Sequence, residues 1–252
     1  MQGAPVRRVS SLRGLLHRGN TAATIYVMVM ACGAAGPATA AAIDASATVA
    51  SDYRSRGVSL SDRQPVAGAT VALTAAAGWF AGAEAVSNAR PRNLRLARGR
   101  DAEVDLTAGW SKTIGLLTPS AGVIAYLYPS HGPAEVEAFG SVAGALGPAT
   151  VTLGLNYAPD QAGARGGNLY TYARAAFGIP LTPATITASV GREAGAFDLG
   201  LTKVDYRIGV EAKVWKLTVG ARYVGNDVPK SFASLIRHAT ADTVVGSVAV
   251  AF

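Results

Sequence analysis

From residue 43 to the carboxyl terminus, apolar and polar side chains alternate with a period of two in many short segments. From Asp101 to Thr107 every second residue is Asp, Glu or Thr, and the residues between them are Ala, Val and Leu. Successive side chains of a β-strand point to opposite faces, whereas an amphipathic helix has a period of about 3.6 residues. Outside the N-terminus, no apolar run reaches the roughly 20 residues of a membrane-spanning helix. The chain must therefore build its fold from strands that each have one apolar face.

This alternation predicts about 12 strands. The clearest ones are Asp101–Gly109, Thr150–Tyr157, Lys203–Lys213 and Trp215–Tyr223. The remaining ones are expected at Ile43–Tyr53, Val66–Thr74, Trp79–Ser87, Ala121–Tyr128, Glu135–Val142, Leu169–Phe177, Ala184–Gly191 and Ala241–Phe252.

The connections between these strands alternate between long and short. The long ones are Arg54–Gln64, Asn88–Arg100, Pro129–Ala134, Pro159–Asn168, Ala194–Thr202 and Gly225–Thr240, and only Ser111–Ser120 is a lengthy connection among the short ones. Transmembrane barrels have long extracellular loops and short periplasmic turns. The chain is therefore predicted to be all-β, a transmembrane antiparallel up-and-down β-barrel, and an even number of strands puts both termini on the periplasmic side.

The N-terminal segment has the pattern of a secretory signal peptide. Four arginines precede an uncharged stretch, Thr21–Ala35, and Ala38 and Ala40 supply a small-x-small cleavage pattern. We expect residues 1–42 to be the signal peptide and residues 43–252 to form the outer-membrane β-barrel. A lipoprotein with Cys32 as its lipidated residue is the weaker alternative, because the residues before Cys32 make a poor lipobox. Removal of the segment lowers the formal net charge from +7 to +3, which argues against nucleic-acid binding by the whole protein.

The last predicted strand, Ala241–Phe252, ends at the terminal residue with an aromatic side chain. Its even positions, Val244 to Phe252, form the more apolar face and are expected to face lipid. A terminal aromatic residue is similar to the insertion signal at the end of outer-membrane barrel proteins, so the barrel-assembly machinery is an expected partner through Phe252. Antiparallel closure would pair this strand with Ile43–Tyr53.

Aromatic residues gather near the predicted strand ends. In transmembrane barrels they form girdles at the level of the lipid headgroups. The residues expected in the girdles are Tyr53, Trp79, Trp110, Tyr126, Tyr128, Tyr157, Phe177, Trp215, Tyr223 and Phe252.

Several motifs in the first half of the barrel resemble one family. Ser51–Ser59 reads S-D-Y-R-S-R-G-V-S, Gly78–Gly82 reads G-W-F-A-G, Glu103–Trp110 reads E-V-D-L-T-A-G-W and Gly122–Pro129 reads G-V-I-A-Y-L-Y-P. With Glu135–Glu137 they follow the order of motifs in the TorF-type (Gcw_chp) porin family, which they resemble from Ser51 to Phe139. This resemblance implies an outer-membrane barrel of the porin kind. The chain departs from the family pattern in the basic loop before Glu103.

Charged residues expected on the lumen face are unevenly distributed. The first half is acidic and the second half is mainly basic, so an acidic wall would face a basic wall across the lumen and orient charged solutes. Ion pairs that fill the lumen are an equally weighted alternative. The predicted pore-lining residues are Glu84, Asp101, Glu103, Asp105, Glu135, Glu137, Arg174, Lys203, Asp205, Arg207, Glu211, Lys213, Lys216 and Arg222.

The long loops carry an excess of arginine, including Arg54 and Arg56 in the first one. A basic mouth could bind lipopolysaccharide phosphates or gather anions, and an ordinary solvated loop is the alternative. The expected contacts for anions or lipopolysaccharide are Arg90, Arg92, Arg95, Arg98 and Arg100.

Catalytic motifs are missing from this sequence. His131 and His238 both lie in predicted loops, and the carboxylate pairs on strands are better placed to line a pore than to perform acid-base chemistry. We expect no catalytic residues, no cofactor and no metal site. The expected function is a porin-like channel for passive diffusion of small hydrophilic solutes. The alternative is a structural or adhesive barrel with a plugged lumen and functional loops.

Overall fold

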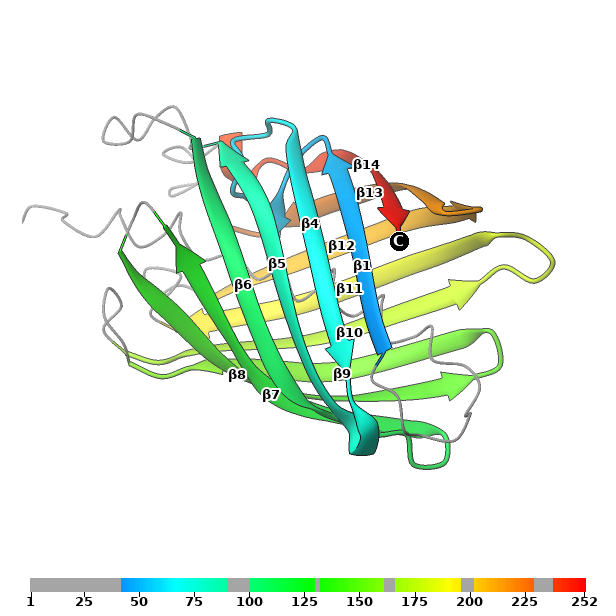
Figure 1. Cartoon of the computed structure of the whole chain (residues 1–252). Helices are drawn as coiled ribbons and strands as arrows, with labels where there is room; N and C mark the ends of the chain where they lie inside the picture. The colour runs from blue at the N-terminus through cyan, green and yellow to red at the C-terminus, as the bar shows by residue number, and fades with distance from the viewer. Residues whose placement is uncertain (1–41, 90–99, 130–131, 161–165, 196–201, 229–237) are drawn as a thin grey trace, which may run out of the picture.

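The computed structural model describes residues 42–89, 100–129, 132–160, 166–195, 202–228 and 238–252. Twelve antiparallel strands close into a barrel (Figure 1). They are β1 (Ala42–Ala50), β4 (Val66–Thr74), β5 (Trp79–Ala89), β6 (Arg100–Ser111), β7 (Leu117–Tyr128), β8 (Gly132–Leu146), β9 (Ala149–Ala158), β10 (Asn168–Gly178), β11 (Ala184–Gly195), β12 (Thr202–Val214), β13 (Leu217–Asn226) and β14 (Thr243–Ala251).

Each barrel strand pairs with its neighbours in sequence, and β1 closes the barrel by pairing with both β4 and β14. The predicted all-β barrel is thus confirmed, together with its up-and-down order and the pairing of its first and last strands. A two-stranded hairpin, β2 (Arg54–Ser55) and β3 (Val58–Ser59), lies in the connection between β1 and β4.

None of the helical segments within the described ranges is long and apolar enough to span a membrane.

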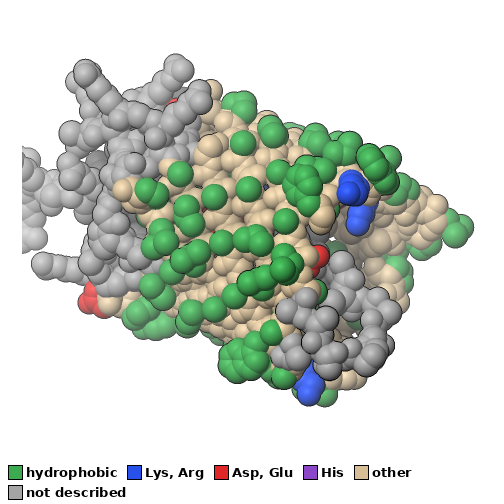
Figure 2. All heavy atoms as spheres, viewed as in Figure 1, with side chains coloured by type: hydrophobic (Ala, Val, Ile, Leu, Met, Phe, Trp, Pro, Cys, Tyr) green, Lys and Arg blue, Asp and Glu red, His purple; other side chains and the backbone are tan. Residues whose placement is uncertain are grey.

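The outer surface of the barrel is apolar. Leu153 on β9, Val190 on β11 and Ile208 on β12 are each at least half exposed, and Figure 2 shows rows of hydrophobic side chains along the strands. The residues between them point inward, as the alternation predicts. In β14, Val244 and Val248 are exposed and Val245 is buried, so the predicted lipid face is the outer one.

Some predicted boundaries are wrong. The first strand ends at Ala50 instead of Tyr53, because the chain turns into the barrel at Ser51–Tyr53. Strand β7, the fifth of the barrel, begins at Leu117 instead of Ala121, so the connection before it is shorter than expected. Trp215 and Lys216 form the turn between β12 and β13, and Trp215 has a φ of 60°.

The aromatic side chains divide into two groups. Trp79, Trp215 and Phe252 are more than half exposed at strand ends, as the girdle prediction requires. Tyr53, Tyr126 and Tyr128 are buried inside the barrel, so the girdle prediction is wrong for these three. Tyr126 is opposite Asp105 in the register of β6 and β7, which puts its side chain on the same inner face as that carboxylate.

Aromatic rings fill part of the lumen. Phe80 and Phe139 lie with their ring centroids 6.4 Å apart, and they pack with the buried Ile124 and Tyr126. A Cβ added at Gly122 would lie 2.8 Å from the ring of Phe139, so this position needs glycine to make room for the ring. This apolar block lies on the inner faces of β5, β7 and β8.

Candidate functional site

The carboxylates predicted on the acidic wall lie inside the barrel where their side chains are described. Glu84, Glu103, Asp105 and Glu137 are each at most 5% exposed. Glu84 and Asp105 are directly opposite in the register of β5 and β6, and like charges in that position repel. The side chains of Asp101 and Glu135 lie outside the described part of the structure.

The basic residues lie on strands from the other half of the barrel. Arg174, Lys203, Arg207 and Arg222 project inward from β10, β12 and β13, with Asp205 and Glu211 on the same face of β12. Strands β6 and β12 are six strands apart in either direction around the barrel, so these two strands lie on opposite sides of the lumen.

Two lysines at the turn end lie away from this site. Lys213 shares the inward parity of β12 but is exposed at the end of the strand. Lys216 lies in the turn after β12, so the structure does not support its assignment to the pore wall. The sequence predicts an inward Lys216 because the alternation of apolar and polar residues already begins at Trp215.

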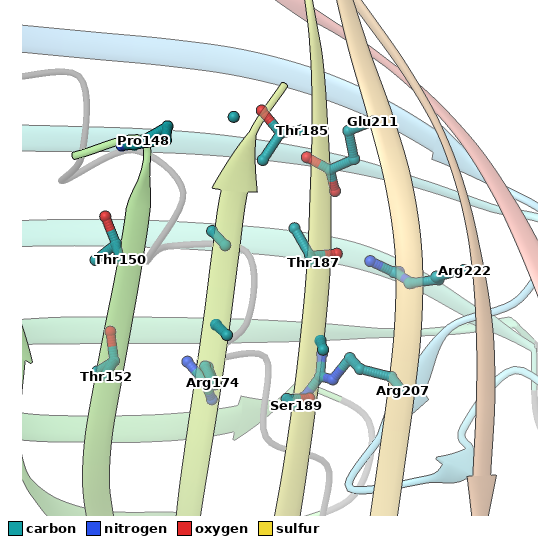
Figure 3. Close-up of a pocket in the computed structure, with 14 residues that line it drawn as sticks. Pro148, Thr150, Thr152, Arg174, Thr185, Thr187, Ser189, Arg207, Glu211 and Arg222 are labelled. Atoms are coloured by element: carbon teal, nitrogen blue, oxygen red, sulfur yellow. The ribbon is translucent and has the colours of Figure 1, made fainter. Parts of the chain in front are cut away.

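A cavity of about 360 Å³ lies inside the barrel. Its lining comes from β9 to β13 and extends to Pro148 and Gly178 at the turn end (Figure 3). The polar lining residues are three arginines, one glutamate and five hydroxyl side chains: Arg174, Arg207, Arg222, Glu211, Thr150, Thr152, Thr185, Thr187 and Ser189.

At the loop end, the segment 51–65 folds into the lumen and contacts the inner wall, and we call this segment the plug. Its centre is the hairpin β2–β3, with Arg56 and Gly57 as the two turn residues. Both have positive φ, 44° and 83°, which is the backbone of the turns that favour Asn-Gly or Gly-Gly. A Cβ at Gly57 would also lie 2.8 Å from the carbonyl oxygen of Gly225, so this turn position requires glycine. Arg56 is strained there, and its side chain must make contacts that offset the strain.

The guanidinium of Arg56 joins two carboxylates on different walls. Its Nη2 donates to both oxygens of Glu137, each at 2.7 Å, and its Nη1 donates to Oε1 of Glu193 on β11. The group also lies over the ring of Tyr170, with Cζ 4.4 Å from the centroid. Burial lowers the pKa of Arg56, but the carboxylates of Glu137 and Glu193 more than offset this and raise its pKa well above the ordinary value. Arg56 therefore stays charged and fixes the plug inside the lumen.

Neighbouring side chains hold these two carboxylates in place. Glu137 accepts hydrogen bonds from Tyr126 and Asn156, each at 3.2 Å. Glu193 accepts one from Asn168 at 2.9 Å and pairs with Lys203. The site that receives Arg56 is therefore built by several strands.

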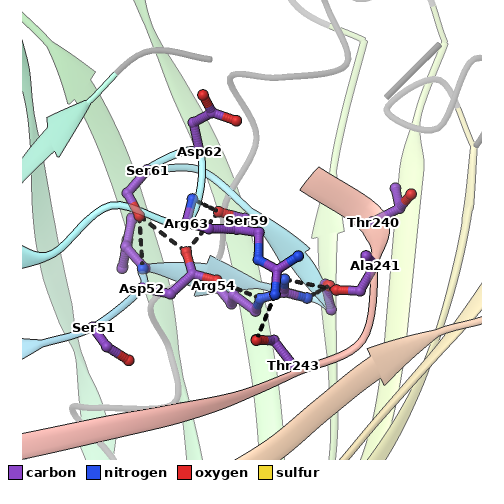
Figure 4. A network of polar contacts seen from close by, with 12 residues as sticks. Ser51, Asp52, Arg54, Ser59, Ser61, Asp62, Arg63, Thr240, Ala241 and Thr243 are labelled. Carbon is purple, nitrogen blue, oxygen red and sulfur yellow. Dashed lines mark hydrogen bonds and ion pairs between the residues drawn. The ribbon is translucent and has the colours of Figure 1, made fainter. Parts of the chain in front are cut away.

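Asp52 organises the plug itself (Figure 4). Its Oδ2 accepts a 2.6 Å hydrogen bond from Nε of Arg54, and its Oδ1 accepts from the hydroxyls of Ser59 and Ser61. Arg54 also donates to the carbonyl oxygen of Ala241, at 2.7 Å. These contacts explain why the segment keeps a defined fold.

The plug also contacts the acidic wall. The hydroxyl of Tyr53 donates to Oε1 of Glu103 at 2.5 Å, and Leu60 belongs to a buried apolar cluster with Val224 and Val245. The sequence places Arg54 and Arg56 among the charges of a basic outer mouth, and for these two residues that prediction is wrong. Both guanidinium groups are buried in ion pairs, at 2% and 3% side-chain exposure.

Other predicted loop contacts fall outside the described residues. These are Arg90, Arg92, Arg95 and Arg98, and the side chain of Arg100. The loop histidine His131 also lies outside the described residues. His238 is described and exposed, with Nδ1 3.4 Å from Oδ1 of Asp62. In the described part of the chain, no group of three or more His, Cys, Asp or Glu side chains has the geometry to hold a metal ion.

A closed twelve-strand barrel with an apolar outer surface and a charged lumen defines a β-barrel protein of the bacterial outer membrane, of the class that includes porins. The chain belongs to the family described as bacterial protein of unknown function (Gcw_chp), whose model matches residues 33–252. The resemblance noted in the sequence is thus confirmed. A comparison with curated proteins finds no match.

Solved structures of outer-membrane channels share this fold. The NanC porin is similar with a TM-score of 0.57 and 11% identity, over 84% of this chain and 99% of that one. The COG4313 outer membrane channel from Pseudomonas putida F1 is similar with a TM-score of 0.51 and 10% identity, over 86% of this chain and 96% of that one. At these identities the likeness concerns the fold.

Proposed function

We propose that this protein is a porin-like channel through which small hydrophilic solutes diffuse passively, along a path narrowed by the plug. The observation that carries the proposal is the cavity of about 360 Å³ lined by arginines and hydroxyl groups inside a closed barrel. A barrel with a purely structural role has no need of three cationic side chains around an internal space.

Opposed charges across the lumen would give this channel its selectivity. Glu84, Glu103 and Asp105 lie on one side, and Arg207 and Arg222 lie on the other. A transverse field of this kind orients a dipolar or charged solute at a constriction.

The plug favours a second candidate, a barrel whose lumen is closed and whose loops carry the function. Arg56 is 4% exposed and bound to two carboxylates. Such a contact could hold the plug permanently inside the lumen.

Planar bilayers and liposomes distinguish these two candidates. For refolded mature protein we expect small, discrete conductance steps and swelling of liposomes in small sugars, because the cavity is narrow and polar. Protein denatured before addition is the control. Silence from protein whose barrel fold has been verified by circular dichroism would reject the channel and favour the closed barrel.

Assembly in the membrane is proposed to depend on Phe252. Its side chain is 76% exposed, while its N–H donates to the carbonyl oxygen of Ala45 at 3.0 Å. Deletion of Phe252 is expected to reduce the amount of barrel inserted in cells and to leave refolding in detergent unchanged, because the ring is free for recognition by the assembly machinery. Phe177→Ala, which removes another exposed aromatic ring, is the matched control. Equal amounts of inserted protein for the deletion and the wild type would contradict the role of Phe252.

A further inference from the structure

The inner faces of four neighbouring strands carry a row of polar side chains at one level of the barrel. Thr152 on β9 is opposite Arg174 on β10, Arg174 is opposite Ser189 on β11, and Ser189 is opposite Arg207 on β12. Directly opposite residues have Cβ atoms about 5 Å apart. The side chains of Arg174 and Arg207 therefore start from positions on either side of Ser189.

A third arginine extends this row. Arg222 on β13 is opposite Gly209, which is two residues from Arg207 along β12. A Cβ at Gly209 would lie 2.8 Å from the Cβ of Arg222, so the glycine leaves the space that Arg222 occupies. All three arginines line the same cavity (Figure 3).

The side chains that line this cavity carry more positive than negative charge. Glu211 is the one carboxylate among its lining residues. Arg174 is additionally stacked on Tyr172, with Cζ 4.1 Å from the ring centroid. Within the described ranges, Arg207 and Arg222 form no hydrogen bond or ion pair with a protein group. Like charges this close repel unless an anion lies between them.

Ser189 gives an independent indication of a ligand. Its hydroxyl is buried in the cavity wall and has no hydrogen-bond partner among the described residues. Buried hydroxyl groups in native proteins are usually hydrogen-bonded. This hydroxyl is a hydrogen-bond donor between two arginines, so it is suited to bind an acceptor atom of a ligand that enters the cavity.

We propose that this cavity is a binding site for a small oxyanion, the phosphate or carboxylate group of a solute, held by Arg174, Arg207 and Arg222 with Ser189 as an uncharged donor. Guanidinium groups bind such oxygens through charge-assisted hydrogen bonds. The inference rests on the proposed channel function, because the solute must enter the lumen, and it names the class of solute that the channel selects.

Calorimetric titration of the folded mature protein in detergent tests binding without any need for transport. The probes are inorganic phosphate and acetate, each at constant ionic strength in chloride, and the comparison of the two distinguishes phosphate from carboxylate groups. We expect saturable binding of at least one probe. Arg207→Gln with Arg222→Gln is expected to weaken it about tenfold or more, because each charge-assisted hydrogen bond is strong.

Two further variants separate a specific site from general attraction by positive charge. Lys213→Gln with Lys216→Gln removes the same charge near the turn end, outside the cavity lining, and is expected to leave the affinity within about twofold of the wild type. Ser189→Ala changes no charge and is expected to weaken binding about threefold or more, as for the loss of one hydrogen bond.

The proposal would be overturned if neither phosphate nor acetate showed saturable binding. It would also be overturned if the arginine double variant and the lysine double variant lost the same amount of affinity. Conductance measurements on the same protein keep this outcome distinct from a failure of the channel. A conducting barrel without anion binding would reject only the oxyanion site, whereas binding without conductance would reject only the channel.

Discussion

Arg56→Ala is expected to raise the single-channel conductance several-fold and to lower the free energy of unfolding by about 3–5 kcal/mol, the range for breaking a buried ion pair by removing one partner. The substitution leaves Glu137 and Glu193 without the cation that joins them. It also removes the group that holds the turn of the plug against Tyr170. Planar-bilayer recordings measure the first effect, and urea-dependent tryptophan fluorescence in lipid vesicles measures the second.

The matched control is Arg192→Ala, which removes an exposed arginine next to Glu193 on β11. We expect it to change neither quantity appreciably, since exposed charges contribute little to stability. Arg56→Lys should give intermediate values, because one ammonium group cannot reproduce the forked contacts of the guanidinium. If Arg56→Ala conducts and unfolds like the wild type, Arg56 does not hold the plug.

Leu153→Arg is expected to destabilise the inserted barrel by about 2–4 kcal/mol, the cost of an arginine on the lipid face near the middle of the bilayer. Leu153 is 61% exposed and lies at the centre of β9, between Ala149 and Ala158. Its side chain points away from the lumen, so a charged group there must face hydrocarbon. Unfolding titrations in vesicles measure the change.

Thr150→Arg is the control for this second prediction. Thr150 is on the same strand, but it lines the cavity, so the new guanidinium would enter a polar space. We expect a smaller loss of stability and a shift of ion selectivity toward anions. Equal destabilisation by the two substitutions would mean that the inner and outer faces of β9 are assigned incorrectly.

The barrel wall could be predicted from the sequence because alternation is a local property. In β6 the spacing of Glu103 and Asp105 already indicates which face is turned toward the lumen. The prediction of the aromatic girdles is wrong where it relies on closeness to a strand end instead of on the alternation of inner and outer faces along the strand. Tyr126 is near the end of β7, yet it is on the same face as the buried Ile124.

The plug could not be predicted in this way, because its contacts join residues far apart in the sequence. Arg56 is 81 residues from Glu137 and 137 residues from Glu193. One signal was present in the sequence: the predicted inner face of the first half was acidic and had no base to balance it. The motifs that carry the family resemblance include Tyr53, Arg56 and Glu103. In the structure these motifs contact one another. The family resemblance therefore covers the plug and the wall residues that bind it.

The hydrogen bonds of the plug also bear on the order in which the protein folds. The seam between β1 and β14 pairs five residues of each strand, compared with nine between β1 and β4. Arg54 and Arg63 reach across this seam to Ala241 and Thr243, over sequence separations of 187 and 180 residues. Contacts with such long loops form late, because chain closure costs entropy before the contact is gained. We therefore expect the first loop to be synthesised to form its contacts late, where it joins the two ends of a barrel whose shortest strand pairing lies between β1 and β14.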